Sequence, residues 1–169
     1  EPEREKSPLL ACLEEIDIFY RLLEQYPDDL MQVCTAADIQ TLLTSGKRGM
    51  MLTVEEGGAC LDSLGALRDL YRLGVRMMTL TWNGPNELAS GNVDPQMGFT
   101  DFGREAVKEM ERQNIIVDVS HLNDKGMEEL MGGLATKPII ATHSNLRSIC
   151  SHKRNLTEEM FQYLSLIHI

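Results

Sequence analysis

The stretch Ile115–Ser144 decides the fold, because two short β-branched runs flank a segment with helical spacing. The first run, IIVDVSH, covers residues 115–121, and the second, PIIATHS, covers residues 138–144. Short, near-continuous apolar runs are typical of strands buried in a parallel sheet. Between them, Asn123–Ala135 begins with a capping residue and places apolar side chains three and four positions apart, which predicts a helix. The stretch therefore predicts one strand–helix–strand unit.

Each of the two strands ends in a histidine, His121 or His143. Because crossover connections of this kind are almost always right-handed, both histidines should reach the same carboxyl edge of the sheet. That edge is where α/β sheets carry their ligands. Either histidine alone would more often be structural, but neutral imidazole is a common zinc ligand. The pair at equivalent positions predicts a metal site.

The same alternation extends along the chain in both directions. Strands are expected at 49–54, 75–81, 115–121 and 139–143, and helices at 8–25, 35–43, 62–73, 100–113, 123–135 and 158–166. Alternation of this kind predicts a parallel sheet with helices outside it. Four β/α units are half of an eight-fold barrel or most of a small doubly wound sheet, and periodicity does not choose between them.

The expected organisation has three parts. Residues 1–48 form an N-terminal helical segment of the barrel domain, residues 49–164 form the four β/α units, and residues 165–169 form an atypical tail. The chain opens with Glu1 rather than Met, and we expect a processed, trimmed or incomplete chain.

The composition excludes several classes of protein. Asp and Glu outnumber Lys and Arg by 26 to 16 among the 169 residues, for a net charge of −10, which argues against nucleic-acid binding. No apolar run approaches the roughly 20 residues of a membrane span, and without a visible signal peptide a cytoplasmic setting is expected. The four scattered cysteines are predicted to be small buried hydrophobes rather than a disulfide frame.

Four other residues are candidates for chemistry. Glu56 follows the first predicted strand and precedes two glycines, so it is either a metal ligand or an ordinary turn acid beside Glu55. Asp118 is expected to be buried and hydrogen-bonded, because an unpaired buried acid is costly. Arg154 could clamp a carboxylate or stand in solvent, and Trp82 could wall a pocket or pack on the rim.

Several motifs taken together resemble the membrane (renal-type) dipeptidase family, and most of all its bacterial members. They are EEGG at 55–58, LGALRDLYRLGVRMMTLTWN at 64–83, the FGREAVKEM helix, DVSH at 118–121, ATHSN at 141–145 and RNLT at 154–157. The resemblance covers about residues 51–164, in order and with compatible spacing.

The resemblance implies about half of a (β/α)8 TIM-type barrel of the metal-dependent hydrolase kind. In the complete enzyme two zinc ions share a hydroxide that attacks the scissile carbonyl of a dipeptide. Glu56 matches the family's bridging carboxylate, His121 and His143 match the two histidines of one metal, and Arg154 matches the arginine that receives the substrate carboxylate. Trp82 stands where some members have a substrate-contacting histidine.

Two departures from the family pattern shape the expectations. The sequence holds no His-x-Asp pair for the other metal, and the acid/base aspartate would lie beyond Ile169. We therefore expect the chain to be the middle of a longer enzyme, and by itself to bind zinc weakly with little or no peptidase activity. Unpaired strand edges of a half-barrel also invite association, such as a homodimer.

Two rival interpretations stay open. The first is another amidohydrolase on the same barrel, acting on a cyclic amide or a small amidated substrate. The second is a non-catalytic, metal-poor relative that serves as a binding module, for which elemental analysis would find no metal.

Overall fold

Helices and strands alternate along residues 7–167, the part of the chain that the computed structural model describes. The helices are α1 (Pro8–Gln25), α2 (Ala36–Ser45), α3 (Leu64–Arg72), α4 (Asp101–Gln113), α5 (Asp124–Glu129) and α6 (Glu158–Ile167). The strands are β1 (Leu30–Gln32), β2 (Arg48–Met50), β3 (Leu52–Glu55), β4 (Val75–Thr79), β5 (Ile116–Asp118) and β6 (Ile139–Ile140). Positions 168 and 169 of the predicted tail lie outside the described residues.

Strands β3, β4, β5 and β6 form one parallel sheet in the order of the sequence. Thr79 of β4 lies opposite Glu55 of β3 and also opposite Asp118 of β5. Directly paired residues of neighbouring strands share a face of the sheet, so these three side chains project to the same side. The order confirms the predicted arrangement of successive β/α units, about half of a (β/α)8 barrel.

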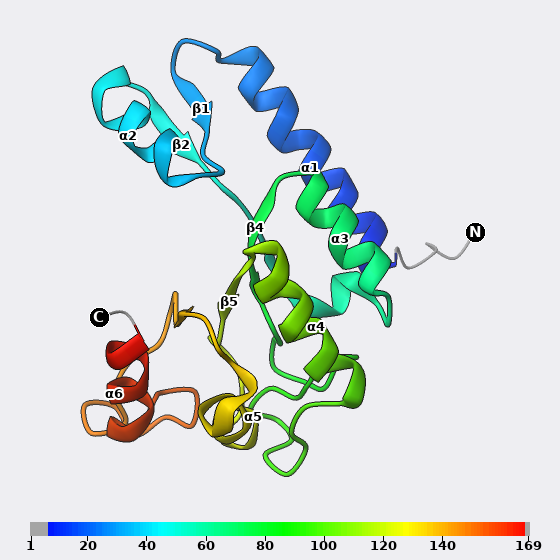
Figure 1. Ribbon diagram of the computed structural model, residues 1–169, viewed down its shortest axis with the longest axis vertical. Coiled ribbons are helices and arrows are strands. Elements are labelled where there is room, and N and C mark those ends of the chain that lie inside the picture. Colours follow the sequence, from blue (N-terminus) through cyan, green and yellow to red (C-terminus); the bar gives the residue numbers. More distant parts are fainter. Residues whose placement is uncertain (1–6, 168–169) are drawn as a thin grey trace.

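A second, two-stranded parallel sheet pairs β1 with β2, and α2 connects them. Strand β1 is not among the elements predicted from the sequence, and residues 49–54 were predicted to be one strand. That strand is divided at Met51, so that β2 pairs with β1 while β3 pairs with β4. Figure 1 shows the extended β2 segment leading from the small sheet toward the main sheet.

Side-chain caps determine where the helices begin. The hydroxyl of Thr35 accepts the N–H of Asp38, whose carboxylate accepts the N–H of Thr35 in return, so a capping box begins α2. Thr100 caps α4 and Asn123 caps α5, each by accepting a backbone N–H three residues on.

The helix expected over Asn123–Ala135 is shorter than predicted. The α-helical part ends at Glu129 and continues as a single π turn over Leu130–Leu134. Gly133 has a φ of 108°, a conformation that glycine adopts readily and that ends regular helix.

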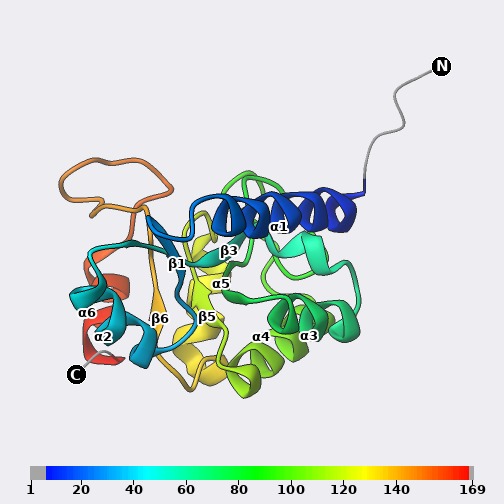
Figure 2. The same cartoon turned by 90° about the horizontal axis from the view of Figure 1, so that it is seen from above.

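The core lies between the sheet and the outer helices. Figures 1 and 2 show α3 and α4 side by side, and α4 packs on β5. Leu67 and Leu70 of α3 and Val107 and Met110 of α4 are fully buried there. Burial of large apolar side chains is the main stabilising contribution to such a layer.

Two further expectations can be compared with the structure. Cys60 is buried, and burial raises its pKa to about 12, but Cys150 is exposed, so the prediction of buried cysteines is wrong there. All four cysteines are free, as expected. Among residues 7–167 every helix is too short or too polar to span a membrane.

Candidate metal centre

Glu55, His121 and His143 meet at the carboxyl edge of the main sheet. One oxygen or nitrogen atom from each lies within 4.8 Å of the others. The Nε2 atom of His121 is 3.1 Å from Oε1 of Glu55, and that of His143 is 3.6 Å from the same oxygen. Catalytic zinc sites use three protein ligands and leave one position open, and two histidines with one glutamate are a known set.

The three side chains come from three different β/α units. Glu55 is the last residue of β3, while His121 follows β5 and His143 follows β6. The prediction that the two histidines reach one edge is confirmed, because their ring centroids are 4.9 Å apart. His121 has a φ of 71°, a left-handed conformation that is uncommon outside glycine and tends to occur at functional sites.

Hydrogen bonds hold the histidine rings in place. Nδ1 of His121 is 3.3 Å from Oδ1 of Asn83, and Nδ1 of His143 is 2.8 Å from the hydroxyl of Thr142. The side-chain amide of Asn92 donates to the backbone carbonyl of His121 at 2.8 Å. Partners of this kind at Nδ1 leave both Nε2 atoms directed at Glu55.

The surroundings of His121 favour the neutral form of its ring. Burial lowers the pKa of His121, and electrostatic interactions with Arg154 and His143 lower it further, against the opposite effects of Glu55 and Asp118. A neutral imidazole offers the lone pair that a metal ion requires. Arg154 is among the charges that lower the pKa of His121, and its binding of a substrate carboxylate stays a prediction.

Asp118 lies fully buried beneath the two histidines. Its carboxylate accepts the N–H groups of Ser120 and Thr142 and the hydroxyls of Thr79 and Thr142. Burial alone would raise the pKa of Asp118, but these hydrogen bonds hold it below its usual value. The expected buried, hydrogen-bonded acid is therefore present, and it joins the ends of β4, β5 and β6.

Glu56 lies next to the three-residue cluster but takes another partner. Its Oε2 accepts the backbone N–H of Trp82 at 3.1 Å and so fixes the start of the long second loop. The indole ring of Trp82 is 55% exposed and 6.3 Å from the ring of His121, so it borders the centre. Metal ligation by Glu56 stays a prediction, and Glu55 is the acid that the structure brings to the histidines.

The alternation of residues in β3 is a sequence signal for Glu55. Strand β3 alternates buried and exposed residues. Leu52 and Val54 are buried, and Thr53 and Glu55 are exposed on the other face of the strand. Glu55 therefore shares its face with Thr79 and Asp118 in the neighbouring strands. For Thr142 and Asn83 no pattern in one sequence distinguishes a hydrogen-bonding partner from an ordinary loop residue.

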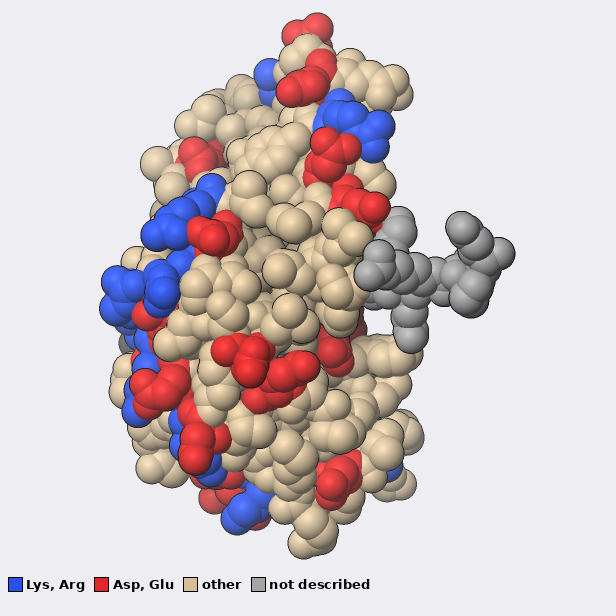
Figure 3. All heavy atoms as spheres, turned by 90° about the vertical axis from the view of Figure 1, so that its right-hand side faces the viewer, with Lys and Arg blue, Asp and Glu red and all other residues tan. Residues whose placement is uncertain are grey.

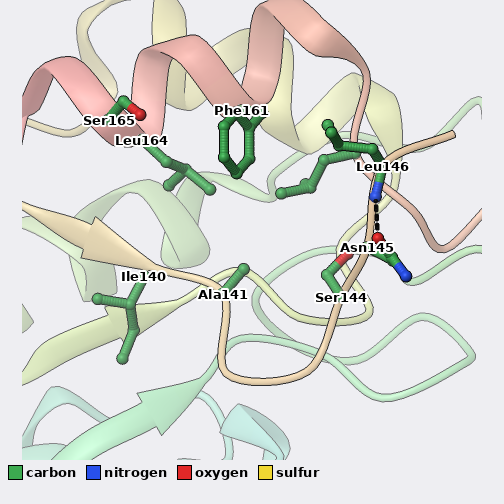
Figure 4. Close-up of a pocket in the computed structure, with 9 residues that line it drawn as sticks. Ile140, Ala141, Ser144, Asn145, Leu146, Phe161, Leu164 and Ser165 are labelled. Carbon is green, nitrogen blue, oxygen red and sulfur yellow. Dashed lines mark hydrogen bonds between the residues drawn. The ribbon is translucent and has the colours of Figure 1, made fainter. Parts of the chain in front are cut away.

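A pocket of about 380 Å³ lies beside the centre, between the end of β6 and α6. Figure 4 shows Phe161 and Leu164 of α6 on the upper side of this pocket. Ile140 and Ala141 lie on one side below them, and Ser144 and Asn145 lie on the other. None of the three cluster residues lines this pocket. The chemistry of the donor atoms, rather than the depth of a cavity, identifies the candidate metal centre.

Acidic and basic side chains are mixed on one face of the molecule. On the face shown in Figure 3, most Lys and Arg side chains lie along the left edge with a further group at the upper right, and Asp and Glu side chains lie among them and across the middle. Nucleic-acid binding favours a continuous basic surface.

Comparison with known proteins matches this chain to a family model and to several solved structures. A sequence model of the family described as membrane dipeptidase (peptidase family M19) matches residues 2–166. An amidohydrolase from Pseudomonas aeruginosa is 27% identical, with a TM-score of 0.88 over 94% of this chain and 49% of its own.

Two further solved structures are similar. A metallopeptidase of family M19, dipeptidase AC, is 26% identical, with a TM-score of 0.85 over 92% of this chain and 48% of its own. A metallopeptidase from Rhodobacter sphaeroides, liganded with a phosphinate mimic of the dipeptide L-Ala-D-Ala, is 29% identical, with a TM-score of 0.76 over 82% of this chain and 41% of its own. The chain thus spans less than half the length of each of these structures.

Proposed function

The chain belongs to the membrane dipeptidase family, peptidase family M19, and on that basis we propose that the whole protein hydrolyses dipeptides at a zinc centre to which Glu55, His121 and His143 contribute. The convergence of these three side chains within 4.8 Å carries the proposal. Fold alone would not, because one barrel architecture hosts many reactions.

The donor set fits a zinc ion. Two imidazole nitrogens and one carboxylate oxygen are ligands that Zn²⁺ takes, and three of them leave a position for substrate or water. When bound, the ion would polarise the scissile carbonyl and activate water. The part of this chain is to present two neutral imidazoles, to supply the counter-charge of Glu55, and to hold the rings through Asn83 and Thr142.

Arg154 is proposed to bind the carboxylate at the end of the dipeptide. Its guanidinium acts on His121, and its Nε is buried with no hydrogen-bond partner among the described residues. A guanidinium with free donors matches the planar geometry of a carboxylate. A carboxylate held there would fix the distance between the end of the substrate and the scissile bond, which selects for dipeptides.

Trp82 is proposed to form one wall of the substrate site. Its exposed ring borders His121, where a histidine stands in some members of the family. An indole provides apolar contact area and a single N–H donor, but it cannot exchange a proton as imidazole does. Polarisation of the carbonyl would then fall to the metal centre.

A substrate panel crossed with an arginine variant tests the proposal. The whole protein is assayed after zinc loading with L-Ala-L-Ala, with L-Ala-D-Ala, which a similar structure holds as a phosphinate mimic, and with the corresponding dipeptide amides. Charged hydrogen bonds contribute about 1.5–3 kcal/mol, so Arg154→Ala should lower kcat/KM for the free acids by roughly 10- to 150-fold. The amides, which have no carboxylate, should show little further loss.

The panel also separates the rival interpretations. Turnover of cyclic amides without turnover of dipeptides would favour another amidohydrolase, and an absence of bound metal in the whole protein would favour a binding module. Equal losses for acids and amides in Arg154→Ala would contradict carboxylate binding by Arg154. For the 169-residue chain alone, which has no His-x-Asp pair, we expect weak zinc binding and little turnover.

A further inference from the structure

The hydroxyl of Thr142 connects a buried acid to one histidine of the candidate metal centre. Its Oγ1 lies 2.7 Å from Oδ2 of Asp118 and 2.8 Å from Nδ1 of His143. Asp118 is completely buried, whereas 44% of the His143 side chain is exposed. The chain of contacts therefore runs from the interior of the sheet to the most exposed ring of the centre.

The contacts of Asp118 fix the direction of each hydrogen bond. Two backbone N–H groups, those of Ser120 and Thr142, can only donate, and they take Oδ1. The hydroxyls of Thr79 and Thr142 take Oδ2, both at 2.7 Å. An ionised carboxylate accepts only, so each of the four contacts has a donor and an acceptor when Thr142 gives its proton to Asp118.

That assignment determines which ring nitrogen of His143 carries the proton. A hydroxyl has one proton to donate and two lone pairs to accept with. Because Thr142 donates to Asp118, it accepts from Nδ1–H of His143, and its second lone pair can accept from Ser120, whose hydroxyl is 3.2 Å away. The Nε2 atom of His143 is left without a proton and faces Glu55.

We propose that Asp118 is a positioning residue which, through the hydroxyl of Thr142, holds His143 in the tautomer that presents a free Nε2 to the metal. The proposal rests on the proposed metal centre and goes beyond it, because it assigns a role to two residues that touch neither metal nor substrate. His121 is held differently, by burial and by the neutral amides of Asn83 and Asn92.

The geometry assigns the opposite tautomer to His152. Nδ1 of His152 accepts the backbone N–H of Arg154 at 3.2 Å, so the proton of its neutral ring must sit on Nε2. The nitrogen-15 NMR signals of the imidazole rings distinguish the two tautomers. Recorded on the metal-free chain near pH 8, they should show Nδ1–H for His121 and His143 and Nε2–H for His152.

Two substitutions at residue 142 form a matched pair. Thr142→Val removes the hydroxyl while keeping the shape of the side chain, and Thr142→Ser keeps the hydroxyl. In Thr142→Val the His143 signals should move toward the Nε2–H form, while those of His152 stay unchanged. Zinc affinity, measured by competition with a chelator, should fall by about 10- to 100-fold, as is typical when a partner of a metal ligand is lost.

Thr142→Ser should restore both the tautomer and the zinc affinity. The inference is overturned if Thr142→Val leaves the His143 tautomer unchanged, or if Thr142→Ser behaves like Thr142→Val. Asp118→Asn tests the acid itself and should also shift the His143 signals. Should that variant not fold, the pair at residue 142 decides alone. A tautomer shift in a protein that cleaves no dipeptide would contradict the proposed function but support this inference.

Discussion

Two buried carboxylates differ in their hydrogen-bond partners. Asp118 lies at the carboxyl edge of the sheet, and Glu109 lies in the outer helix layer. The partners of Asp118 are neutral hydroxyls and backbone amides. The partners of Glu109 are the cations Arg68 and Arg112 together with the amide of Gln113. In both cases the pKa of the acid lies below its usual value, and for Glu109 it is about 2.

The difference shows how one fold separates stability from chemistry. The cations beside Glu109 neutralise its charge and link α3 to α4. The Glu109 carboxylate therefore stabilises the packing of these two helices. Neutral donors around Asp118 fix the carboxylate but leave its negative charge uncompensated. That charge can then orient the groups of the metal centre above it.

The largest expected effect belongs to the outer layer. Leu67 of α3 is fully buried, and replacing such a leucine by alanine typically lowers the free energy of unfolding by about 2–5 kcal/mol. Urea denaturation of Leu67→Ala should show a loss in this range. The zinc affinity of the folded protein should stay unchanged. A parallel loss of zinc affinity would contradict the view that the outer helix layer contributes to stability alone.

The next largest effect is expected at the carboxyl edge of the sheet, where it shows whether Glu55 or Glu56 is the metal ligand. Glu55 meets the two histidines, while Glu56 accepts from the N–H of Trp82. Glu55→Gln should weaken zinc binding by more than the roughly 100-fold upper cost of losing an outer partner, with a smaller loss for Glu56→Gln. A larger loss for Glu56→Gln than for Glu55→Gln in a chelator competition would identify Glu56 as the ligand. Glu56 is the acid that the family resemblance implies.

A smaller effect is expected at Asn83. Its Oδ1 lies 3.3 Å from Nδ1 of His121, a longer contact than the one that Thr142 makes with His143. A neutral hydrogen bond contributes about 0.5–1.5 kcal/mol, so Asn83→Ala should weaken zinc binding by roughly 2- to 10-fold. A loss larger than that of Thr142→Val would show that His121 depends on its partner more than His143 does.

The smallest effect concerns Glu109. Its arginine partners are partly exposed, and such ion pairs contribute about 0.2–1 kcal/mol. Because the pKa of Glu109 is depressed from 4.5 to about 2 in the folded chain, its contribution is present above pH 4.5 and is lost as the pH falls toward 2. In Glu109→Gln that part of the acid destabilisation should vanish from denaturation curves, and an unchanged pH dependence would contradict this assignment.

Periodicity and capping residues predicted the helices well, because those signals are local. The predicted helix over residues 8–25 coincides with α1, and the capping box at Thr35 is present. The order of the four main strands also followed from the sequence, since each β/α unit places its strand beside the previous one.

What the sequence did not reveal depends on contacts between distant segments. Strand β1 has three residues, Leu30–Gln32, too few for a pattern of alternation, so its pairing with β2 defines it. Of the adjacent acids Glu55 and Glu56, the alternation of β3 favours Glu55, but the register of β3 against β4 is needed to place it beside Thr79. The role of Thr142 depends on Asp118, which is distant along the chain but adjacent across the sheet.

The spread of the metal centre along the chain sets an order on its assembly during synthesis. Glu55 ends β3 and His121 follows β5, but His143 follows β6, which pairs with β5. An ion that requires all three side chains can therefore be captured only after residue 143 has left the ribosome and β6 has joined the sheet.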